Sequence, residues 1–366
     1  MTLEEFCAYA ENFAREHGEP GTLSFRHLQR LVAGKGPKGQ PLGPIRPATA
    51  RLLERIFETD SRELLAPPMQ AIAPPDDAEL RDRIKKSRRV DAGMLKGLCD
   101  QLSTIRRIDR QYGAIVTHNE LLSKISQVRN LFVYSLSGDT RRELAILLSE
   151  MHALAGWQSL DMGDCSVSWH HYEQAKMFAL EAKDTSYRVH AVAEQAFTLV
   201  EMGEIGSAVE LIESTRQMAK RFCSQLLCSW NHAACGEVLA AAGEASFALK
   251  QFDEAENRLP SDTLVSCGPY VVLDMNHLTR WRGSSSVRLG VPSSLGLLTE
   301  AIGGLDPSFS RAESALRVDL ASALAGVGDL ASAQDQMHIG IRIATSVGSQ
   351  RQLNKARRFE KMLGSR

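Results

Sequence analysis

The densest group of side chains able to bind a metal comprises Cys223, Cys228, His232 and Cys235. In a helix, Cys228, His232 and Cys235 share one face because they are spaced i, i+4 and i+7. The group lacks the C-x2-C and H-x3-5-H spacings of structural zinc sites, so a packed helix face is the favoured interpretation. The chain has seven cysteines, an odd and scattered set that is typical of reduced, buried thiols in the cytosol.

Motifs for covalent or phosphate chemistry are also missing from the sequence. The segment GKGPKGQ (34–40) lacks the GK[ST] ending of a phosphate-binding loop, and no dinucleotide-binding GxGxxG occurs. The pair His170-His171 has no HExxH context, and there is no GxSxG nucleophile motif. We therefore expect no enzymatic activity, no catalytic residue, no bound metal and no cofactor.

Proline placement predicts an all-α fold. Nine of the thirteen prolines lie at or before residue 75, and none occurs from 76 through 259. Because proline interrupts helices, this long stretch rich in Ala, Leu, Glu and Gln favours continuous helical architecture. The two Pro-Pro pairs of LLAPPMQAIAPPDD mark a semi-rigid linker. We predict a helix-turn-helix-like domain (1–66), a Pro-rich linker (67–80), a helical connector (81–140) and a repeat domain (141–366).

From about residue 141 a unit recurs that consists of a helix, a Gly-acid turn and a second helix. Three of the turn glycines are 40 residues apart, and a small residue follows four of the turns by five positions. The glycine is expected to adopt the left-handed conformation, the acid to cap the next helix, and the small residue to allow close packing. The turns are Gly163-Asp164, Gly203-Glu204, Gly243-Glu244, Gly290 and Gly328-Asp329, and the small residues are Ser168, Ala208, Ala248 and Ala333.

These units resemble tetratricopeptide-type helical hairpins, with about 40 residues per repeat instead of the usual 34. Such hairpins stack, and the first helix of each pair lines a concave surface that holds a peptide in related peptide-sensing regulators. A C-terminal helix (351–363) with a basic outer face would cap the stack. The polar residues expected to contact a ligand on the concave surface are Arg188, Gln195, Asn231, Asn276 and Arg280.

Residues 22–55 form a basic cluster with seven Lys/Arg and one Glu. Ser24 is a suitable N-cap for a short helix that ends at Gly34, and Pro47 suits the first turn of a second helix. Phe25, Leu28, Leu31 and Val32 are expected to face inward. The candidate DNA contacts are Ser24, Arg26, His27, Arg30, Lys35, Lys38 and Arg46.

The segment from Ser24 to Gly34 resembles the recognition helix of a repressor-like helix-turn-helix domain, and IRPATARLLERIFETDSRELL (45–65) resembles the helices packed behind it. The chain is similar to divergent actinobacterial transcriptional regulators with a tetratricopeptide-like C-terminal domain. LSTIRRIDRQYG (102–113) and LAGWQSLDMGD (154–164) extend the similarity. The resemblance implies a homodimer that binds double-stranded operator DNA and holds a peptide, small-molecule or protein partner in its groove.

A second interpretation stays open, because only one helical segment precedes Ser24 where a complete domain of this type has two. In that case the N-terminal module does not bind DNA, and the chain is a protein–protein interaction scaffold whose basic face meets an acidic protein surface. The net charge of −1 does not decide between these, because it sums +3 over 1–110, −9 over 111–350 and +5 over 351–366. No long uncharged apolar run or N-terminal signal pattern occurs, so no membrane partner and a cytoplasmic location are expected.

Overall fold

The computed structural model of the chain describes residues 2–34, 45–57, 59–64, 76–262 and 268–364. All regular elements in these ranges are helices, which confirms the all-α prediction. The chain divides into two compact units, Met1–Asp77 and Ala78–Arg366. Within the same ranges, no helix is both long and apolar enough to cross a bilayer.

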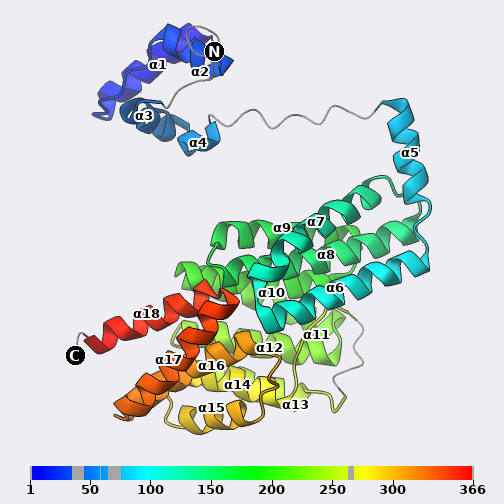
Figure 1. Cartoon of the computed structure of the whole chain (residues 1–366), viewed down its shortest axis with the longest axis vertical. Coiled ribbons are helices and arrows are strands. Elements are labelled where there is room, and N and C mark those ends of the chain that lie inside the picture. Colours follow the sequence, from blue (N-terminus) through cyan, green and yellow to red (C-terminus); the bar gives the residue numbers. More distant parts are fainter. Residues whose placement is uncertain (1, 35–44, 58, 65–75, 263–267, 365–366) are drawn as a thin grey trace. The chain divides into compact units, whose positions relative to one another are not determined.

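The N-terminal unit is a cluster of short helices around a small apolar core (Figure 1). Its helices are α1 (Leu3–Glu16), α2 (Phe25–Ala33), α3 (Pro47–Phe57) and α4 (Ser61–Leu64). Phe6 and Ala10 of α1, Leu28 of α2 and Leu53 of α3 meet in this core. A Cβ on Gly21 would lie 2.4 Å from the carbonyl oxygen of Ala48, so glycine permits the chain before α2 to pass close to α3.

Helix α2 begins and ends as the sequence predicts. The side chain of Ser24 accepts a hydrogen bond from the backbone N–H of His27, and Gly34 ends the helix with φ 63°. The inward position expected for Val32 is wrong, because this side chain is 69% exposed. A nine-residue helix on so small a core buries only a narrow stripe, which Leu28 occupies.

The C-terminal unit is a series of antiparallel helices. Helix α5 begins at Asp77, so the last residues of the predicted linker are helical, whereas residues 65–75 lie outside the described ranges. The helices are α5 (Asp77–Ser87), α6 (Ala92–Tyr112), α7 (Ala114–Val133), α8 (Gly138–Asp161), α9 (Cys165–Glu181), α10 (Thr185–Met202), α11 (Ile205–Phe222), α12 (Gln225–Ala241), α13 (Ala245–Arg258), α14 (Met275–Arg288), α15 (Ser294–Gly303), α16 (Ser310–Gly326), α17 (Leu330–Val347) and α18 (Gln350–Gly364).

The five predicted hairpins are present as α8–α9, α10–α11, α12–α13, α14–α15 and α16–α17. Every turn glycine has a φ between 67° and 87°, which confirms the expected left-handed positions. Asp164 and Asp329 cap the following helices through their side chains, as predicted. The capping prediction is wrong for Glu204 and Glu244, which occupy the N-cap position without a side-chain hydrogen bond. Glutamate is not among the preferred N-cap residues, whereas the shorter aspartate is.

In two hairpins, α8–α9 and α12–α13, a glycine on the first helix faces a large aromatic side chain on the second. A Cβ on Gly156 would lie 2.9 Å from the ring of Tyr172, and one on Gly236 would lie 2.7 Å from the ring of Phe252. Both rings are fully buried. The two pairs are 80 residues, or two repeats, apart, and the repeat between them has the buried pair Ala196 and Ile212 at the same positions. The 40-residue repeat therefore preserves a packing contact as well as a turn.

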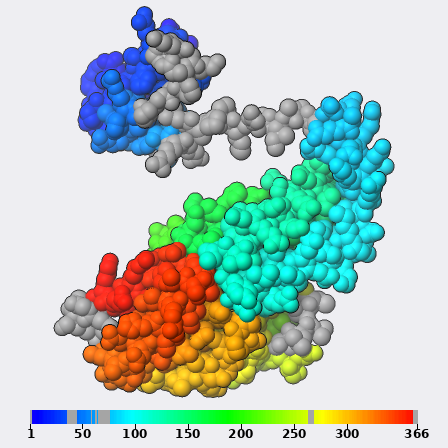
Figure 2. Space-filling model, viewed as in Figure 1, coloured from blue at the N-terminus to red at the C-terminus, as the bar shows by residue number. Residues whose placement is uncertain are grey.

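The stack of hairpins closes on itself. Helices α16 and α17 contact α6, and α18 contacts α8, although these pairs are far apart in sequence. In Figure 1 the orange and red helices lie beside the cyan α6, and on the face shown in Figure 2 the orange and cyan-green surfaces of this unit meet. The first helices of the hairpins therefore lie on the inner side of the closed stack.

The close contact at Gly236 gives a first test of the packing. We expect Gly236→Ala to lower the free energy of unfolding by about 1–3 kcal/mol, because the added methyl has no room beside the fixed ring of Phe252. Urea denaturation at neutral pH measures the change. The control is Gly206→Ala in α11, where a Cβ meets nothing within 4 Å, so the better helix former should leave stability unchanged or raised. Equal effects of the two substitutions would contradict the assigned contact.

Candidate functional site

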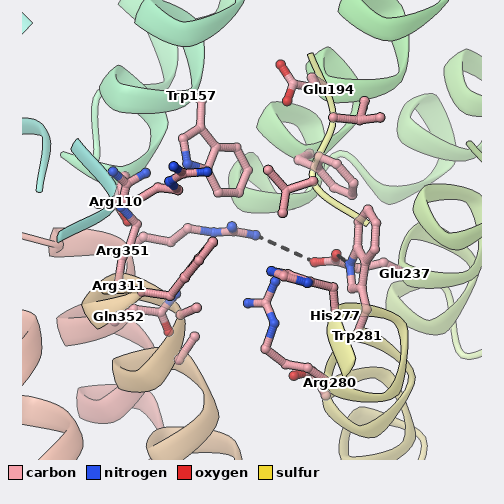
Figure 3. A pocket seen from close by; sticks show the side chains of 18 of the residues that line it. Arg110, Trp157, Glu194, Glu237, His277, Arg280, Trp281, Arg311, Arg351 and Gln352 are labelled. Atoms are coloured by element: carbon pink, nitrogen blue, oxygen red, sulfur yellow. Dashed lines mark hydrogen bonds and ion pairs between the residues drawn. The ribbon is translucent and has the colours of Figure 1, made fainter. Parts of the chain in front are cut away.

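A cavity of about 350 Å³ lies inside the closed stack. Its walls come from α6, α8, α10, α12, α14, α16 and α18, together with the segment 270–272 that precedes α14. The first helix of every hairpin contributes, which confirms that these helices form the inner surface. Figure 3 shows side chains from opposite walls that converge in this space.

Charged and aromatic side chains dominate the lining. The aromatic residues are Trp157, Phe197, Trp230, Tyr270, Trp281 and Phe309. The cations are Arg106, Arg110, Arg280, Arg288, Arg311, Arg351, Lys355 and Arg358, and the acids are Asp109, Glu150, Asp161, Glu194, Glu201, Glu237 and Asp319. Along each helix the lining residues recur every three, four or seven positions, in several helices with one adjacent residue beside them, so they form one stripe per helix.

Arg311 joins the last hairpin to the first helices of the body. It makes ion pairs with Asp109 of α6 and with Asp161 of α8, where Nε lies 3.3 Å from Oδ2. The three side chains are between 2% and 11% exposed. Burial by itself lowers the pKa of Arg311, but the carboxylates of Asp109 and Asp161 outweigh it and raise the pKa. Arg311 therefore stays charged and holds the two ends of the stack together.

Arg351 of α18 makes a second connection across the cavity. Its Nε donates to Glu201 of α10 at 2.7 Å, and its Nη2 lies 3.7 Å from Glu237 of α12 (Figure 3). Glu237 also accepts a hydrogen bond from the indole N–H of Trp281. Burial opposes the charge, yet Glu201 and Glu237 raise the pKa of Arg351. The C-terminal helix is thus fixed to the inner surface rather than only to the last hairpin.

Two titratable groups on α10 are held neutral. Burial, and then the charge of Glu150, raise the pKa of Glu194 to about 8. Burial lowers the pKa of His190 to about 4. The two side chains are 3.6 Å apart. At neutral pH Glu194 is therefore mostly protonated, and it contributes little negative charge to the cavity.

Four of the cavity's cations have no carboxylate within 4.0 Å among the described residues. They are Arg110, Arg280, Arg288 and Arg358. Arg110 donates to the hydroxyl of Tyr270 and lies over the ring of Phe309, whereas Arg280 has no hydrogen bond to any described residue. Six acids engage the other four cations. The lining therefore has an excess of guanidinium groups.

Several polar atoms in the cavity wall are buried without a protein partner. Within the described ranges these include Nε of Arg110, Nε of Arg280, Nε2 of His277 and Oε1 of Gln352. Buried donors and acceptors require partners, so water or a ligand must satisfy these atoms. The requirement makes this cavity the candidate ligand site of the body.

The structure brings only one of the five predicted ligand contacts to the cavity, namely Arg280. Gln195 is fully buried and hydrogen-bonds Lys176 and Glu173 of α9, and Asn231 donates to Thr215 of α11. Asn276 donates to the backbone oxygen of Gly304, and Arg188 is exposed outside the lining. The three amides thus bind first helices to the outer helices, which corrects their expected place on the concave surface.

The error is one of register. Glu194 and Trp230 line the cavity one position before the expected Gln195 and Asn231, and His277 lines it one position after the expected Asn276. A first helix of this stack is buried on nearly all sides, so its pattern of polar residues does not show which side faces inward. The expected basic outer face of the C-terminal helix is corrected in part: Arg351, Lys355 and Arg358 line the cavity, whereas Arg357 and Lys361 are exposed outside its lining. The spacing of the three lining residues by four and then three positions indicates that they share one face of the helix.

The N-terminal unit carries the second candidate site. Ser24, Arg26 and Arg30 are exposed on α2, His27 is partly buried, and Arg46 is exposed just before α3. The predicted contacts Lys35 and Lys38 lie outside the described residues. The guanidinium groups of Arg26 and Arg30 are one helical turn apart and form no ion pair with any described residue. This face of α2 is therefore available to an anionic partner.

Comparison with known proteins gives no identification: no protein-family model and no curated protein matches the sequence.

The ion pairs of Arg311 give a second test. We expect Arg311→Met to lower the free energy of unfolding by about 3–5 kcal/mol, because it leaves the buried carboxylates of Asp109 and Asp161 without a cation. Chemical denaturation of the full chain measures the loss. Arg216→Met is the matched control, since Arg216 pairs with the exposed Glu213 and its loss should cost less than about 1 kcal/mol. A similar cost for both variants would argue against closure by Arg311.

The buried histidines predict how stability depends on pH. Burial lowers the pKa of His152 to about 3 and those of His171 and His190 to about 4, against 6.5 in the unfolded chain. As the pH falls below 6.5 the unfolded chain binds protons that the folded chain does not, so the free energy of unfolding decreases. The loss is on the order of 2 kcal/mol per histidine at pH 5.

Denaturation of wild-type protein, His190→Gln and His338→Gln at pH 7 and pH 5 measures this dependence. His190→Gln should show a smaller loss of stability between the two pH values than the wild type. His338 is exposed, so His338→Gln should retain the full loss. A loss in His190→Gln equal to that of the wild type would exclude His190 as a contributor.

Proposed function

We propose that this chain is a DNA-binding transcriptional regulator whose helical body senses a ligand. The observation that carries the proposal is that the two compact units offer different kinds of surface. One exposes a capped basic helix, α2, and the other encloses a cavity with unpaired cations and unsatisfied polar atoms. The resemblance to actinobacterial helix-turn-helix regulators with tetratricopeptide-like domains supports the same assignment. We propose no catalytic step.

Helix α2 has the properties of a helix that enters the major groove. Arg26 and Arg30 are on its exposed side, where arginine can contact either guanine edges or phosphates. Ser24 is the exposed N-cap of the helix, and helix N-termini bind phosphate groups. Arg46 adds attraction that does not depend on base sequence.

We propose that the regulator acts as a homodimer on a two-fold symmetric operator in the cytoplasm. A ligand shifts a conformational equilibrium only if it binds one state more tightly than the other. The cavity is bordered by helices from both ends of the stack, α6 and α18, so its shape depends on how tightly the stack closes. A bound ligand would thereby fix the curvature of the body and change the spacing of the two DNA-binding units.

A second function is favoured by one specific observation. Helix α1 ends at Glu16 and α2 begins at Phe25, so eight residues separate them, compared with the 3–4-residue turn of a helix-turn-helix. A unit with this connection is suited to present α2 to an acidic protein surface instead of DNA. The chain would then be an interaction scaffold.

Selection of the full chain against random-sequence duplex DNA, followed by titration at several salt concentrations, tests the first function. We expect binding that weakens as salt rises, because phosphate contacts release counterions. The double variant Arg26→Gln/Arg30→Gln should weaken binding at least tenfold and reduce the salt slope by about 1–2.

The double variant Arg15→Gln/Arg342→Gln removes the same amount of charge from exposed positions away from α2 and should bind like the wild type. Absence of salt-dependent DNA retention, or equal weakening in both double variants, would favour the scaffold.

A further inference from the structure

Arg280 is the cavity cation whose surroundings most clearly require an anion. Its side chain points from α14 into the cavity, where Arg351 approaches from the other side (Figure 3). Its Nε is buried, has no hydrogen-bond partner and no ion pair within the described ranges. The nearby carboxylates of Glu237 and Asp319 are already engaged by Arg351 and Lys355. Glu237, Asp319 and Asp274 act on Arg280 from a distance, but none of them forms an ion pair with it in the described part of the chain.

His277 is placed beside Arg280, one helical turn earlier on the same stripe of α14. Its Nδ1 is 2.7 Å from Oδ1 of Asp274, so Nδ1 carries the proton that this carboxylate accepts. Burial and then the charge of Arg280 lower the pKa of His277, which keeps the ring neutral. Its Nε2 is thus a free acceptor that has no partner in the described part of the chain.

Next to Arg280 the cavity wall is aromatic. The ring of Trp281 lies 6.0 Å from that of Trp230 and 6.2 Å from that of Phe197. The indole N–H of Trp281 donates to Glu237, which fixes the ring in place. A guanidinium group beside immobilised aromatic rings suits a molecule that has an anionic group joined to a flat apolar one.

The size of the cavity limits the ligand. At about 350 Å³ it is near the lower end of the range of roughly 300–1,000 Å³ for small-molecule sites. A space of this size takes one small molecule. The protonated state of Glu194 and the excess of guanidinium groups favour a negative ligand.

We propose that the cavity binds a small organic anion, with its carboxylate or phosphate group on Arg280 and its planar ring against Trp281 and Trp230. A hydrogen-bond donor on the ligand meets Nε2 of His277. The inference rests on the proposed function in treating this cavity as the sensor, and it names the class of signal. It also replaces the peptide of the related regulators with a small molecule.

Calorimetric titration of the full chain, without DNA, with three probes that share one ring tests the proposal. The probes are 1-naphthyl phosphate, 1-naphthoate and the uncharged 1-naphthol. We expect at least one of the two anions to bind with one site per chain and at least tenfold more tightly than 1-naphthol. Whichever anion binds more tightly shows whether the natural ligand is a phosphate or a carboxylate.

Arg280→Gln is the decisive variant. It should weaken binding of the anion at least tenfold, which is about 1.4 kcal/mol, and leave that of 1-naphthol unchanged. Since Arg280 has no carboxylate partner, the variant should unfold at the same or a higher temperature than the wild type, whereas a structural role would make it less stable. Arg280→Lys, which keeps the charge but loses the fork of guanidinium donors, replaces it if Arg280→Gln does not fold, and should also weaken binding of the anion.

Arg188→Gln is the control, because Arg188 is exposed outside the cavity. This variant should bind all three probes like the wild type. The proposal is overturned if no anion binds, if 1-naphthol binds as tightly as the anions, or if Arg280→Gln retains full affinity. Because no DNA is present, these outcomes are independent of the DNA-binding test. A chain that binds the anion but no DNA would disprove only the regulator assignment.

Discussion

The ion pairs of Arg311 with Asp109 and Asp161 are the interaction on which the rest of the body depends. They join α16 to α6 across 202 residues of sequence and to α8 across 150, and so turn an open stack of hairpins into a closed one. Stacked repeats by themselves contact only their neighbours. Closure adds a contact between the ends, and the groove along the first helices becomes a cavity between them.

Because these ion pairs are buried, closure of the stack depends on the charge state of their side chains. A buried guanidinium stabilises the fold only while both of its carboxylates remain ionised and in place, since each ion has left its hydration shell. Arg351 follows the same rule with Glu201 and Glu237, and its side chain crosses the cavity that the closure creates. The interactions that hold the body together are therefore the walls of its candidate ligand site. A ligand that changes these walls has a direct physical route to the shape of the body.

The unpaired cations have a different character. Keeping Arg280 charged and without a partner in a partly buried position costs stability, and a protein selected for stability alone would replace it. Burial lowers the pKa of Arg280, because the charged form is less well solvated there. Positions that are unfavourable in the unliganded protein are typical of binding sites, where the ligand supplies the missing interaction. Arg311, in the same cavity, makes two ion pairs, and this contrast separates a structural arginine from a candidate ligand contact.

The sequence determined the local structure of this protein. The turn glycines, the Asp caps, the boundaries of α2 and the use of first helices for the inner surface follow from residue type and spacing, because each depends on a few neighbouring residues. Tertiary structure decided which stripe of each first helix faces the cavity, and so selected Glu194 rather than Gln195 and His277 rather than Asn276. It also decided that α18 turns Arg351 inward and that α16 reaches α6. These outcomes depend on the small rotation between successive hairpins, summed over five of them, which no local pattern records.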